Sequence, residues 1–336
     1  VDKDGYLCGG FYAGRTHVIV PVEDCWLSHA SHGRILEALL SHMEKYAVLP
    51  YDEKSGRGWV RHLLIRENRA GEVLVCLVIN GKKKPGTVWM PVLESLVDEI
   101  SKVAPLVGLC VNENTRRDNV IMGEVSHTLW GEGRLEDTIC LEQEREGVFA
   151  PVGQELSFSL SPSSFFQVNA KQMPKLYGLA VEYAALRPED TVIDLYCGIG
   201  TISLFLAQRA KMVYGVEWSA EAVEDARRNA QKNGISNVRF MAGDADKALA
   251  DLASQGIRGN TVVLDPPRRG CDASVLEKLL EMAPERIVYV SCNPAALARD
   301  LARLAQGGYR MERVRGVDQF GQTGHVETVV LMSKVK

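Results

Sequence analysis

The chain has 336 residues, of which 46% are hydrophobic and 24% are charged, and its formal net charge at pH 7 is -4. This composition is typical of a globular protein long enough for two domains, and the charge counts mildly against a nucleic-acid partner without excluding a local basic face. No apolar run approaches the ~20 residues of a membrane helix and no secretory signal pattern is present, so we expect a cytoplasmic protein without a membrane partner.

Residues 1–157 are predicted to form a smaller α+β domain, in which Gly and Asn turns separate short strand-like runs. The expected strands are 16–22, 59–66, 73–80 and 119–125, and the expected helices are 33–46 and 91–103. Two basic clusters, Lys82-Lys83-Lys84 and Arg116-Arg117, are candidate RNA phosphate contacts, with a solvated loop as the alternative for each. This domain is therefore the candidate RNA-contacting half of the chain.

Residues 158–336 are predicted to form an α/β domain, because strands and helices alternate from about residue 171. The expected strands are 191–195, 212–216, 238–241, 261–264 and 286–291, and the expected helices are 202–209, 220–233, 245–252 and 273–282. Such alternation predicts a parallel sheet with helices on both faces. Two strand runs without a helix between them, 309–318 and 326–333, predict an antiparallel hairpin at the sheet edge.

The first of these strands runs into Asp194-Leu195-Tyr196-Cys197-Gly198-Ile199-Gly200-Thr201. The glycines allow close approach of a ligand to the backbone, but the loop lacks the lysine of a phosphate-binding loop and the third glycine of a nicotinamide site. The next strands lead to Glu217, which suits ribose hydroxyls, and to Asp244, which is placed to reach an adenine edge. The pattern favours a nucleoside cofactor over a plain strand-to-helix turn.

The fourth and fifth strands end in Asp265-Pro266-Pro267-Arg268 and Ser291-Cys292-Asn293-Pro294. Both motifs are expected at the same edge of the sheet as the cofactor loop. The proline pair stiffens the turn that holds Asp265. Cys292 heads a new helix, whose N-terminus is expected to lower the thiol pKa and favour a nucleophilic thiolate.

The eight cysteines are scattered and include no Cys-x-x-Cys pair, which argues against a disulfide framework or a self-contained zinc site. Most cysteines are small buried hydrophobic residues, and we expect this of Cys197 and Cys271.

Together these motifs resemble the RNA uracil-5-methyltransferases, which act on transfer RNA or large-subunit ribosomal RNA. The matching stretches follow the family's order: Ser164-Phe165-Phe166-Gln167-Val168-Asn169, 194–201, Asp265-Pro266-Pro267-Arg268-Arg269-Gly270, 291–294, and Gly324-His325-Val326-Glu327-Thr328-Val329-Val330. The resemblance implies a Rossmann-like class I fold dependent on S-adenosyl-L-methionine. It also implies formation of 5-methyluridine in RNA.

The resemblance assigns roles residue by residue. Cys292 matches the nucleophile, which would form a covalent adduct with C6 of the uracil, and Glu327 matches the general base. Phe165 matches an aromatic near the target base, and Gln167 a residue between cofactor and uracil. The other matches to cofactor contacts are Tyr196, Thr201, Glu217, Asp244 and Asp265, the last of which also lies beside the base.

The chain departs from the family at an iron–sulfur site. Many members carry an N-terminal β-barrel and three cysteines that hold a four-iron cluster with a fourth, which Cys25 matches. The barrel and the other three ligands are absent, and Cys8 is a poor substitute, so we expect no cluster here. The sequence, which begins with Val1, is either truncated or that of a member without the cluster.

The match of Cys25 favours 23S ribosomal RNA as the substrate, with transfer RNA as the alternative, and we expect a monomer. Two other enzyme classes stay open, namely methyltransferases of exocyclic nitrogens and of RNA cytosine C5. A non-catalytic RNA-binding protein that retains the fold is the remaining alternative.

Overall fold

The structure is a computed structural model that describes the chain except residues 2–4, 15, 24, 26–27, 82–88 and 336, with the side chains of residues 89–91 also left aside. The chain forms two compact units: Val1–Asp137 with Leu160–Ser163, and Thr138–Ser159 with Ser164–Lys336. The domain boundary at residue 157 stays a prediction. Among the described residues, no helix has the length and apolar character needed to cross a bilayer.

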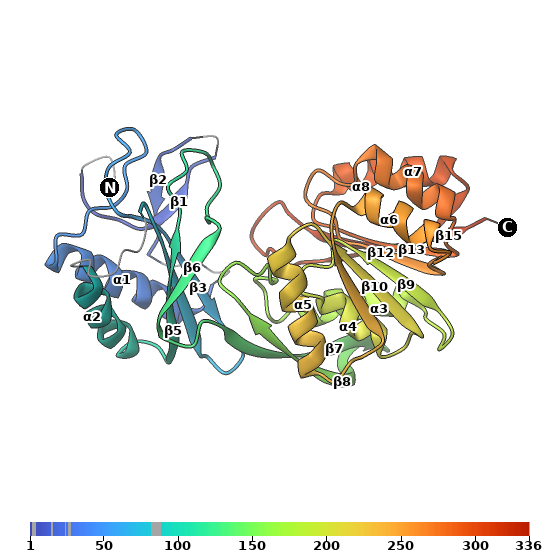
Figure 1. The fold of residues 1–336 in the computed structure, drawn as a ribbon, viewed down its shortest axis with the longest axis horizontal. Coiled ribbons are helices and arrows are strands. Elements are labelled where there is room, and N and C mark those ends of the chain that lie inside the picture. The colour runs from blue at the N-terminus through green and yellow to red at the C-terminus, as the bar shows by residue number, and fades with distance from the viewer. Residues whose placement is uncertain (2–4, 15, 24, 26–27, 82–88, 336) are drawn as a thin grey trace. The chain divides into compact units, whose positions relative to one another are not determined.

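The first unit has the predicted α+β character. Its four-stranded sheet has the order β3-β4-β5-β6, and β4 is buried along its whole length. Helices α1 and α2 pack together on the sheet, as Figure 1 shows. The elements are β1 (Gly10–Tyr12), β2 (Ile19–Pro21), α1 (Ala30–Lys45), β3 (Val60–Glu67), β4 (Val73–Ile79), α2 (Trp89–Ser101), β5 (Leu106–Glu113) and β6 (Val125–Gly131).

Two strand predictions in this unit are wrong. Residues 119–124 form a loop that precedes β6, because asparagine side chains bind the backbone there. Asn114 Nδ2 donates to the carbonyls of Val120 and Ile121 at 2.7 and 2.9 Å, and Asn112 accepts from the Gly123 N–H at 2.7 Å. The run at 16–22 forms only the three-residue strand β2, whose partner β1 and the strand β5 were not predicted.

The second unit contains a seven-stranded sheet with the order β11-β10-β9-β12-β13-β15-β14. Its first five strands are parallel, and β14 and β15 form the predicted antiparallel hairpin at one edge. These strands are β9 (Thr191–Leu195), β10 (Met212–Glu217), β11 (Val238–Ala242), β12 (Thr261–Leu264), β13 (Arg286–Ser291), β14 (Tyr309–Val317) and β15 (Glu327–Lys334).

Helices cover both faces of this sheet, as predicted. In Figure 1, α3, α4 and α5 lie on one face, and α6, α7 and α8 lie on the other. The positions of the four predicted helices match α4, α5, α6 and α7. The helices are α3 (Met173–Ala184), α4 (Thr201–Ala207), α5 (Ala220–Lys232), α6 (Ala245–Ser254), α7 (Ala273–Met282) and α8 (Pro294–Gln306).

The hairpin of β7 (Leu135–Arg145) and β8 (Val148–Leu160) was not predicted, and most of it belongs to the second unit. A Cβ at Gly178 of α3 would lie 2.0 Å from the Glu142 carbonyl oxygen, so the helix packs directly on the β7 backbone. Asn233, the residue after α5, exchanges two hydrogen bonds with the Ser157 backbone, and Asn229 of α5 accepts from the Ser159 N–H. Polar side chains therefore fix the hairpin to the helices.

Candidate functional site

The second unit holds every predicted catalytic, cofactor and substrate residue. The cofactor loop, Glu217, Asp244, Asp265 and Cys292 follow the carboxyl ends of the parallel strands. Since these ends share one edge of the sheet, the topology brings the predicted residues to a common rim. Glu327 reaches the same rim from the opposite direction, because β15 runs antiparallel to β13.

The cofactor loop needs its glycines for two different reasons. Gly200 adopts a φ of 81°, and a Cβ there would lie 2.7 Å from Cζ of Phe240, so no larger residue fits without a shift. Gly198 has a φ of 53°, but a Cβ there would meet no atom within 4 Å. This side of the loop therefore faces open space in which a ligand can approach the backbone. Thr201, the first residue of α4, is buried beneath it.

Asp194, the last but one residue of β9, is a buried carboxylate with a free oxygen. The Ser203 hydroxyl donates to Oδ2 at 2.5 Å, whereas Oδ1 has no hydrogen-bond partner within the described structure. Burial raises the pKa of Asp194 to about 7, against which the Ser203 hydrogen bond acts. A buried acceptor without a partner indicates a place for a donor that the protein itself does not supply.

Glu217 at the end of β10 is held by the backbone, since Oε2 accepts from the Gly198 N–H and Oε1 from the Ser219 N–H, both at 3.1 Å. The carboxylate is thus fixed directly under the cofactor loop. Trp218, the next residue, is 78% exposed, which is unusual for a large aromatic side chain. Sequence reasoning missed Trp218, although its position after the acidic residue was the available signal. Asp244 is exposed and forms an ion pair with Lys247 at 2.7 Å.

Tyr196 contacts the protein core through its side chain. Its φ of 64° lies in the left-handed region, and its ring packs against the buried cluster below the loop, where it hydrogen-bonds Cys271. Cys271 is buried and also contacts the Tyr289 hydroxyl at 3.5 Å, and Cys197 is buried as well. Both cysteines are therefore buried, as the sequence predicted.

Cys292 and Glu327 lie at the same end of two adjacent antiparallel strands, β13 and β15. Ser291 of β13 pairs with Thr328 of β15, so the next residue on one strand and the preceding residue on the other reach the same end of the ladder. Cys292 is partly exposed, whereas Glu327 is only 4% exposed. Burial raises the pKa of Glu327 to about 7, and the positive charge of Arg268 acts against this. The two predicted catalytic groups thus lie together.

The predicted lowering of the Cys292 pKa is wrong. Burial raises the pKa of the thiol, and the charges of Glu327 and Asp265 raise it further. Arg268 hydrogen-bonds the thiol and acts to lower its pKa, but does not outweigh the other effects. The N-terminus of α8 is already occupied, because the Asn293 side chain accepts from the backbone N–H groups of Ala295 and Ala296. Arg268, one position beyond the proline pair, was not singled out from the sequence.

Asp265 and Tyr177 lie between the cofactor loop and the Cys292–Glu327 pair. Burial raises the pKa of Asp265, and the charges of Glu327 and Asp194 add to the effect. Burial also raises the pKa of Tyr177, a residue of α3, and the charges of Asp265, Glu327 and Asp194 add to the effect. Tyr177 was missed because a tyrosine within an apolar helical stretch reads as a core residue.

In the segment 164–169, Ser164 and Gln167 are buried, whereas Phe165 and Val168 are exposed. The Ser164 hydroxyl donates to Asp225 Oδ2 at 2.8 Å, and Gln167 is 6% exposed. Gln167 acts to lower the pKa of Tyr177. Phe165 is 69% exposed. The two predicted substrate residues therefore differ in exposure: Gln167 faces the protein interior, and the ring of Phe165 faces solvent.

The predictions for the first unit concern two basic clusters and Cys25. Lys82-Lys83-Lys84 lies outside the described residues. Arg116 is exposed, and its Nε and Nη2 both donate to Asp118 Oδ2, so a carboxylate already neutralises part of its charge. Cys25 is partly buried, and within the described residues no group of three or more metal-binding side chains is assembled. The roles of Cys25 and Arg116 stay predictions.

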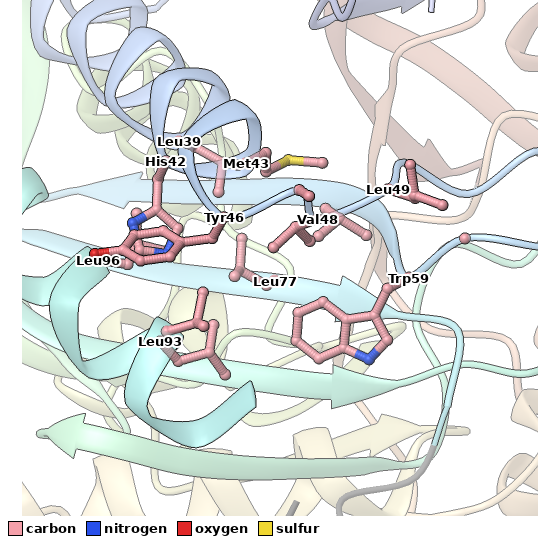
Figure 2. Close-up of a pocket in the computed structure, with 14 residues that line it drawn as sticks. Leu39, His42, Met43, Tyr46, Val48, Leu49, Trp59, Leu77, Leu93 and Leu96 are labelled. Atoms are coloured by element: carbon pink, nitrogen blue, oxygen red, sulfur yellow. The ribbon is translucent and has the colours of Figure 1, made fainter. Parts of the chain in front are cut away.

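An apolar pocket of about 620 Å³ lies between α1, α2 and the sheet of the first unit. Figure 2 shows Leu77, Leu93 and Trp59 around it, and the rings of His42 and Tyr46 at the end away from Trp59. The centroids of these two rings are 4.6 Å apart. His42 is already bound to Glu99 at 3.0 Å. None of the predicted catalytic or cofactor residues lines this pocket, so its size is no guide to the chemistry.

The strand order of the second unit, with a glycine-containing loop after β9 and an acid after β10, defines a class I S-adenosylmethionine-dependent methyltransferase fold. The family model described as tRNA (Uracil-5-)-methyltransferase matches residues 132–335. The chain belongs to this family and is an RNA methyltransferase.

Curated relatives and a solved structure agree with this assignment. An uncharacterized RNA methyltransferase of Halalkalibacterium halodurans is 42% identical over 98% of this chain and 68% of its own length. One of Clostridium tetani is 42% identical over 96% of this chain and 66% of its own, so the chain spans about two thirds of these relatives. The crystal structure of Pyrococcus abyssi tRNA (uracil-54, C5)-methyltransferase in complex with S-adenosyl-L-homocysteine has a TM-score of 0.70 and 25% identity, covering 94% of this chain and 70% of that one.

Proposed function

We propose that this protein transfers a methyl group from S-adenosylmethionine to C5 of a uridine in RNA, through a covalent adduct of Cys292. The observation that supports this most directly is the pairing of Cys292 and Glu327 at the end of the β13–β15 ladder, on the rim that also bears the cofactor loop. An exocyclic-nitrogen methyltransferase needs no such thiol, and a non-catalytic RNA-binding protein needs neither group.

The residues present fit the cofactor. The open side of Gly198 admits a ligand, the free Oδ1 of Asp194 suits a donor such as an ammonium group, and Glu217 suits ribose hydroxyls. We assign Trp218 to an adenine face, because an exposed indole beside a ribose-binding acid offers a stacking surface. When bound, S-adenosylmethionine supplies an electrophilic methyl group on its sulfonium.

The proposed chemistry begins with Cys292, which is partly exposed and loses its thiol proton to solvent. The resulting thiolate attacks C6 of the uracil and forms a C–S bond. The C5=C6 electron pair moves toward the O4 carbonyl, giving an enolate. C5 would then take the methyl group, while the bond between that methyl and the sulfonium sulfur breaks and S-adenosylhomocysteine leaves. Glu327 removes the C5 proton, and the electrons of that C–H bond re-form C5=C6 as the C6–S bond breaks. Cys292 leaves as a thiolate, ready for another cycle.

Removal of the C5 proton needs a base whose pKa lies near neutral pH. Such a base is largely deprotonated at that pH and is still strong enough to take the proton. The pKa of Glu327, raised to about 7 by burial, meets this requirement. Arg268 interacts with both the thiol and Glu327, so it links the nucleophile and the base. General-base assistance of this kind typically contributes 10²–10⁴-fold.

The substrate within RNA is proposed as 23S ribosomal RNA, on the match of Cys25 to the cluster ligand of the family. Transfer RNA is the second candidate, favoured by the likeness to the Pyrococcus abyssi enzyme, whose own substrate is tRNA uracil-54. In either RNA the target base has to leave the stack before Cys292 can reach C6. Exposed Phe165 offers a surface on which such a base can stack.

The covalent step is tested with RNA that contains 5-fluorouridine. Fluorine cannot leave as a cation, so wild-type protein with S-adenosylmethionine should accumulate an RNA adduct that survives a denaturing gel. Cys292→Ser should form none while S-adenosylhomocysteine affinity, measured by calorimetry, stays within about twofold. Cys271→Ser is the matched control and should retain the adduct. An adduct of the Cys292→Ser variant would refute the assignment of the nucleophile.

The substrate is tested by mapping 5-methyluridine in RNA from a strain that lacks the protein. Loss of one modified position from 23S ribosomal RNA, restored by the wild-type gene but not by the Cys292→Ser variant, is the expected result. Loss confined to transfer RNA would refute the ribosomal assignment and establish the second candidate. Unchanged 5-methyluridine in both RNAs would contradict the proposed reaction.

A further inference from the structure

Asn169 ends the segment that bears the predicted uracil contacts and ties this segment to α3. Its side-chain Oδ1 accepts from the N–H groups of Lys171 and Gln172, both at 3.2 Å, as asparagine commonly does in turns. Its backbone carbonyl accepts from the N–H of Met173 at 2.9 Å, where α3 begins. The end of the segment is therefore held by the start of the helix.

The other end of the Asn169 amide binds a residue 150 positions away along the chain. Its Nδ2 donates to the Gln319 carbonyl at 3.3 Å, and Gln319 Nε2 donates to the Asn169 carbonyl at 3.4 Å. Because a carbonyl only accepts and an N–H only donates, these partners and the helix N–H groups fix the orientation of the Asn169 amide. Gln319 is fully buried. The two residues thus form a reciprocal link between the segment and the chain that follows β14.

Gln319 lies beside the start of the strand that carries Glu327. Val317, the last residue of β14, is the ladder partner of Glu327, the first residue of β15. Gln319 follows Val317 by two residues, and its N–H donates to the Val317 carbonyl at 2.9 Å. The reciprocal link with Asn169 therefore anchors the end of the β14–β15 ladder at which the carboxyl group of Glu327 is held.

We propose that Asn169 is a positioning residue that holds the general base, Glu327, in place against the segment that bears the uracil contacts. The inference rests on the proposed uridine methylation and deepens it. Cys292 lies on a different turn, where Asn293 Nδ2 donates to the Arg268 carbonyl at 2.9 Å. Nucleophile and base are thus supported by different asparagines. Loss of the Asn169 link should slow removal of the C5 proton and leave attack on C6 intact.

The test is Asn169→Ser. The serine hydroxyl can still accept from the Lys171 and Gln172 N–H groups, as serine does in similar turns, but it is too short to reach the Gln319 carbonyl. The change introduces no charge that would shift the pKa of Glu327. We expect kcat on uridine RNA to fall about tenfold, the effect of one lost hydrogen bond. Affinity for S-adenosylhomocysteine, measured by calorimetry, should not change.

RNA that contains 5-fluorouridine separates the two chemical steps. Its adduct forms by attack on C6 and methyl transfer, and no proton is removed from C5. The rate of adduct formation by Asn169→Ser should therefore stay within about twofold of the wild type, although turnover on uridine falls. On ordinary uridine RNA, the variant should accumulate a methylated adduct that survives a denaturing gel, because elimination waits for proton removal.

Asn260→Ala is the matched control. Asn260 also accepts from a backbone N–H, that of Thr191 at 3.0 Å, but it lies at the opposite edge of the sheet, before β12. This variant should change neither rate. Equal falls of turnover and adduct formation in Asn169→Ser, or an unchanged turnover, would overturn the inference. Wild-type protein that forms no adduct with 5-fluorouridine RNA would refute the proposed function instead, so the two failures are distinguishable.

Discussion

At the scale of single residues, three carboxyl groups lie at the rim of the methyltransferase unit: Asp194 and Glu327 are buried, and Asp265 is partly exposed. Asp194, Asp265 and Glu327 all have raised pKa values, and burial is the largest cause for each. Structural carboxylates in ion pairs show the opposite shift, as Asp190 does between Arg187 and Arg286. Carboxyl groups whose pKa is raised by burial occur preferentially at sites of ligand binding or proton transfer.

The first prediction concerns Arg268 and pH. Glu327 must lose its proton to act as a base, so the rate should rise as pH increases through about 7. Arg268 lowers the pKa of both Glu327 and Cys292. Arg268→Met should therefore move this rise to higher pH and reduce kcat at pH 7 on the order of tenfold. Single-turnover rates between pH 5.5 and 9 measure this shift.

Arg269→Met is the matched control for the pH profile, because Arg269 is the adjacent arginine but pairs with Asp272 at 3.0 Å. Its profile should resemble that of the wild type. A profile of Arg268→Met that is lower at every pH by the same factor would contradict the electrostatic role of Arg268.

The second prediction concerns Asp194 and stability. Its pKa is raised from 3.8 to about 7, so the folded state binds this proton more tightly than the unfolded state. Its contribution to stability is complete below about pH 4 and is lost as pH rises through 7. Asp194→Asn mimics the protonated form, and should exceed the wild type in free energy of unfolding at pH 8, by at most about 4 kcal/mol. Cofactor affinity should fall at the same time.

Urea unfolding at pH 5 and pH 8 checks the sign. Asp190→Asn is the opposite control: burial acts to raise the Asp190 pKa, but Arg187 and Arg286 outweigh it, so the pKa is lowered. The Asp190 carboxylate stabilises the fold at pH values above its pKa in the unfolded chain. The loss in free energy of unfolding for Asp190→Asn should therefore be larger at pH 8 than at pH 5. A stability difference for Asp194→Asn that is equal at both pH values would contradict the assigned shift.

At the scale of elements, the start of α8 connects helix capping to catalysis. The Asn293 side chain caps the helix through Ala295 and Ala296, and its Nδ2 donates to the Arg268 carbonyl at 2.9 Å. One side chain thus ties the turn after Cys292 to the turn that bears Arg268. The turns that bear the proposed nucleophile and Arg268 therefore share one supporting side chain.

The third prediction follows from this cap. Asn293→Ala should destabilise the protein by about 1 kcal/mol, the usual cost of a lost N-cap, and should also reduce kcat, because Cys292 and Arg268 lose a common support. Asn237→Ala is the matched control, since Asn237 holds the Ala207 and Ala210 carbonyls at the end of α4. It should lower stability without lowering kcat. Equal effects of the two variants on kcat would refute the coupling.

At the scale of the whole molecule, the β7–β8 hairpin decides where an independent methyltransferase unit begins. Leu156 and Phe158 are buried, and the ring of Phe158 lies 6.1 Å from that of Phe205. Together with the Asn229 and Asn233 contacts, these side chains make β8 part of the core around α4 and α5.

The fourth prediction compares two fragments. Fragment 138–336 should fold cooperatively and bind S-adenosylhomocysteine with nearly the affinity of the full chain. Fragment 158–336 should be markedly less stable, because it lacks Leu156, the Ser157 hydrogen bonds and the β7 backbone against which Gly178 packs. Circular dichroism melts and calorimetry measure both properties. Equal stability of the two fragments would place the boundary at residue 157 instead.

The sequence by itself determined the class of the second unit. The alternation of strand and helix patterns predicted the parallel sheet. Because ligands bind at the carboxyl ends of the strands in such sheets, the strand ends predicted Glu217, Asp265 and Cys292 as site residues. Local patterns also located most helices, since their periodicity depends only on neighbouring residues. The strand predicted at 119–125 was wrong because the side chains of Asn112 and Asn114, which are distant along the chain, bind the backbone of this loop.

Only the tertiary structure decided the electrostatics and the supporting contacts. The Cys292 pKa is raised rather than lowered, because burial and the charges of Glu327 and Asp265 outweigh what one helix end and Arg268 supply. Tyr177 and Arg268 gain their significance from partners 10 or more residues away along the chain. A pattern of residue types records which chemistry is available, whereas desolvation and long-range charge depend on distances that exist only after folding.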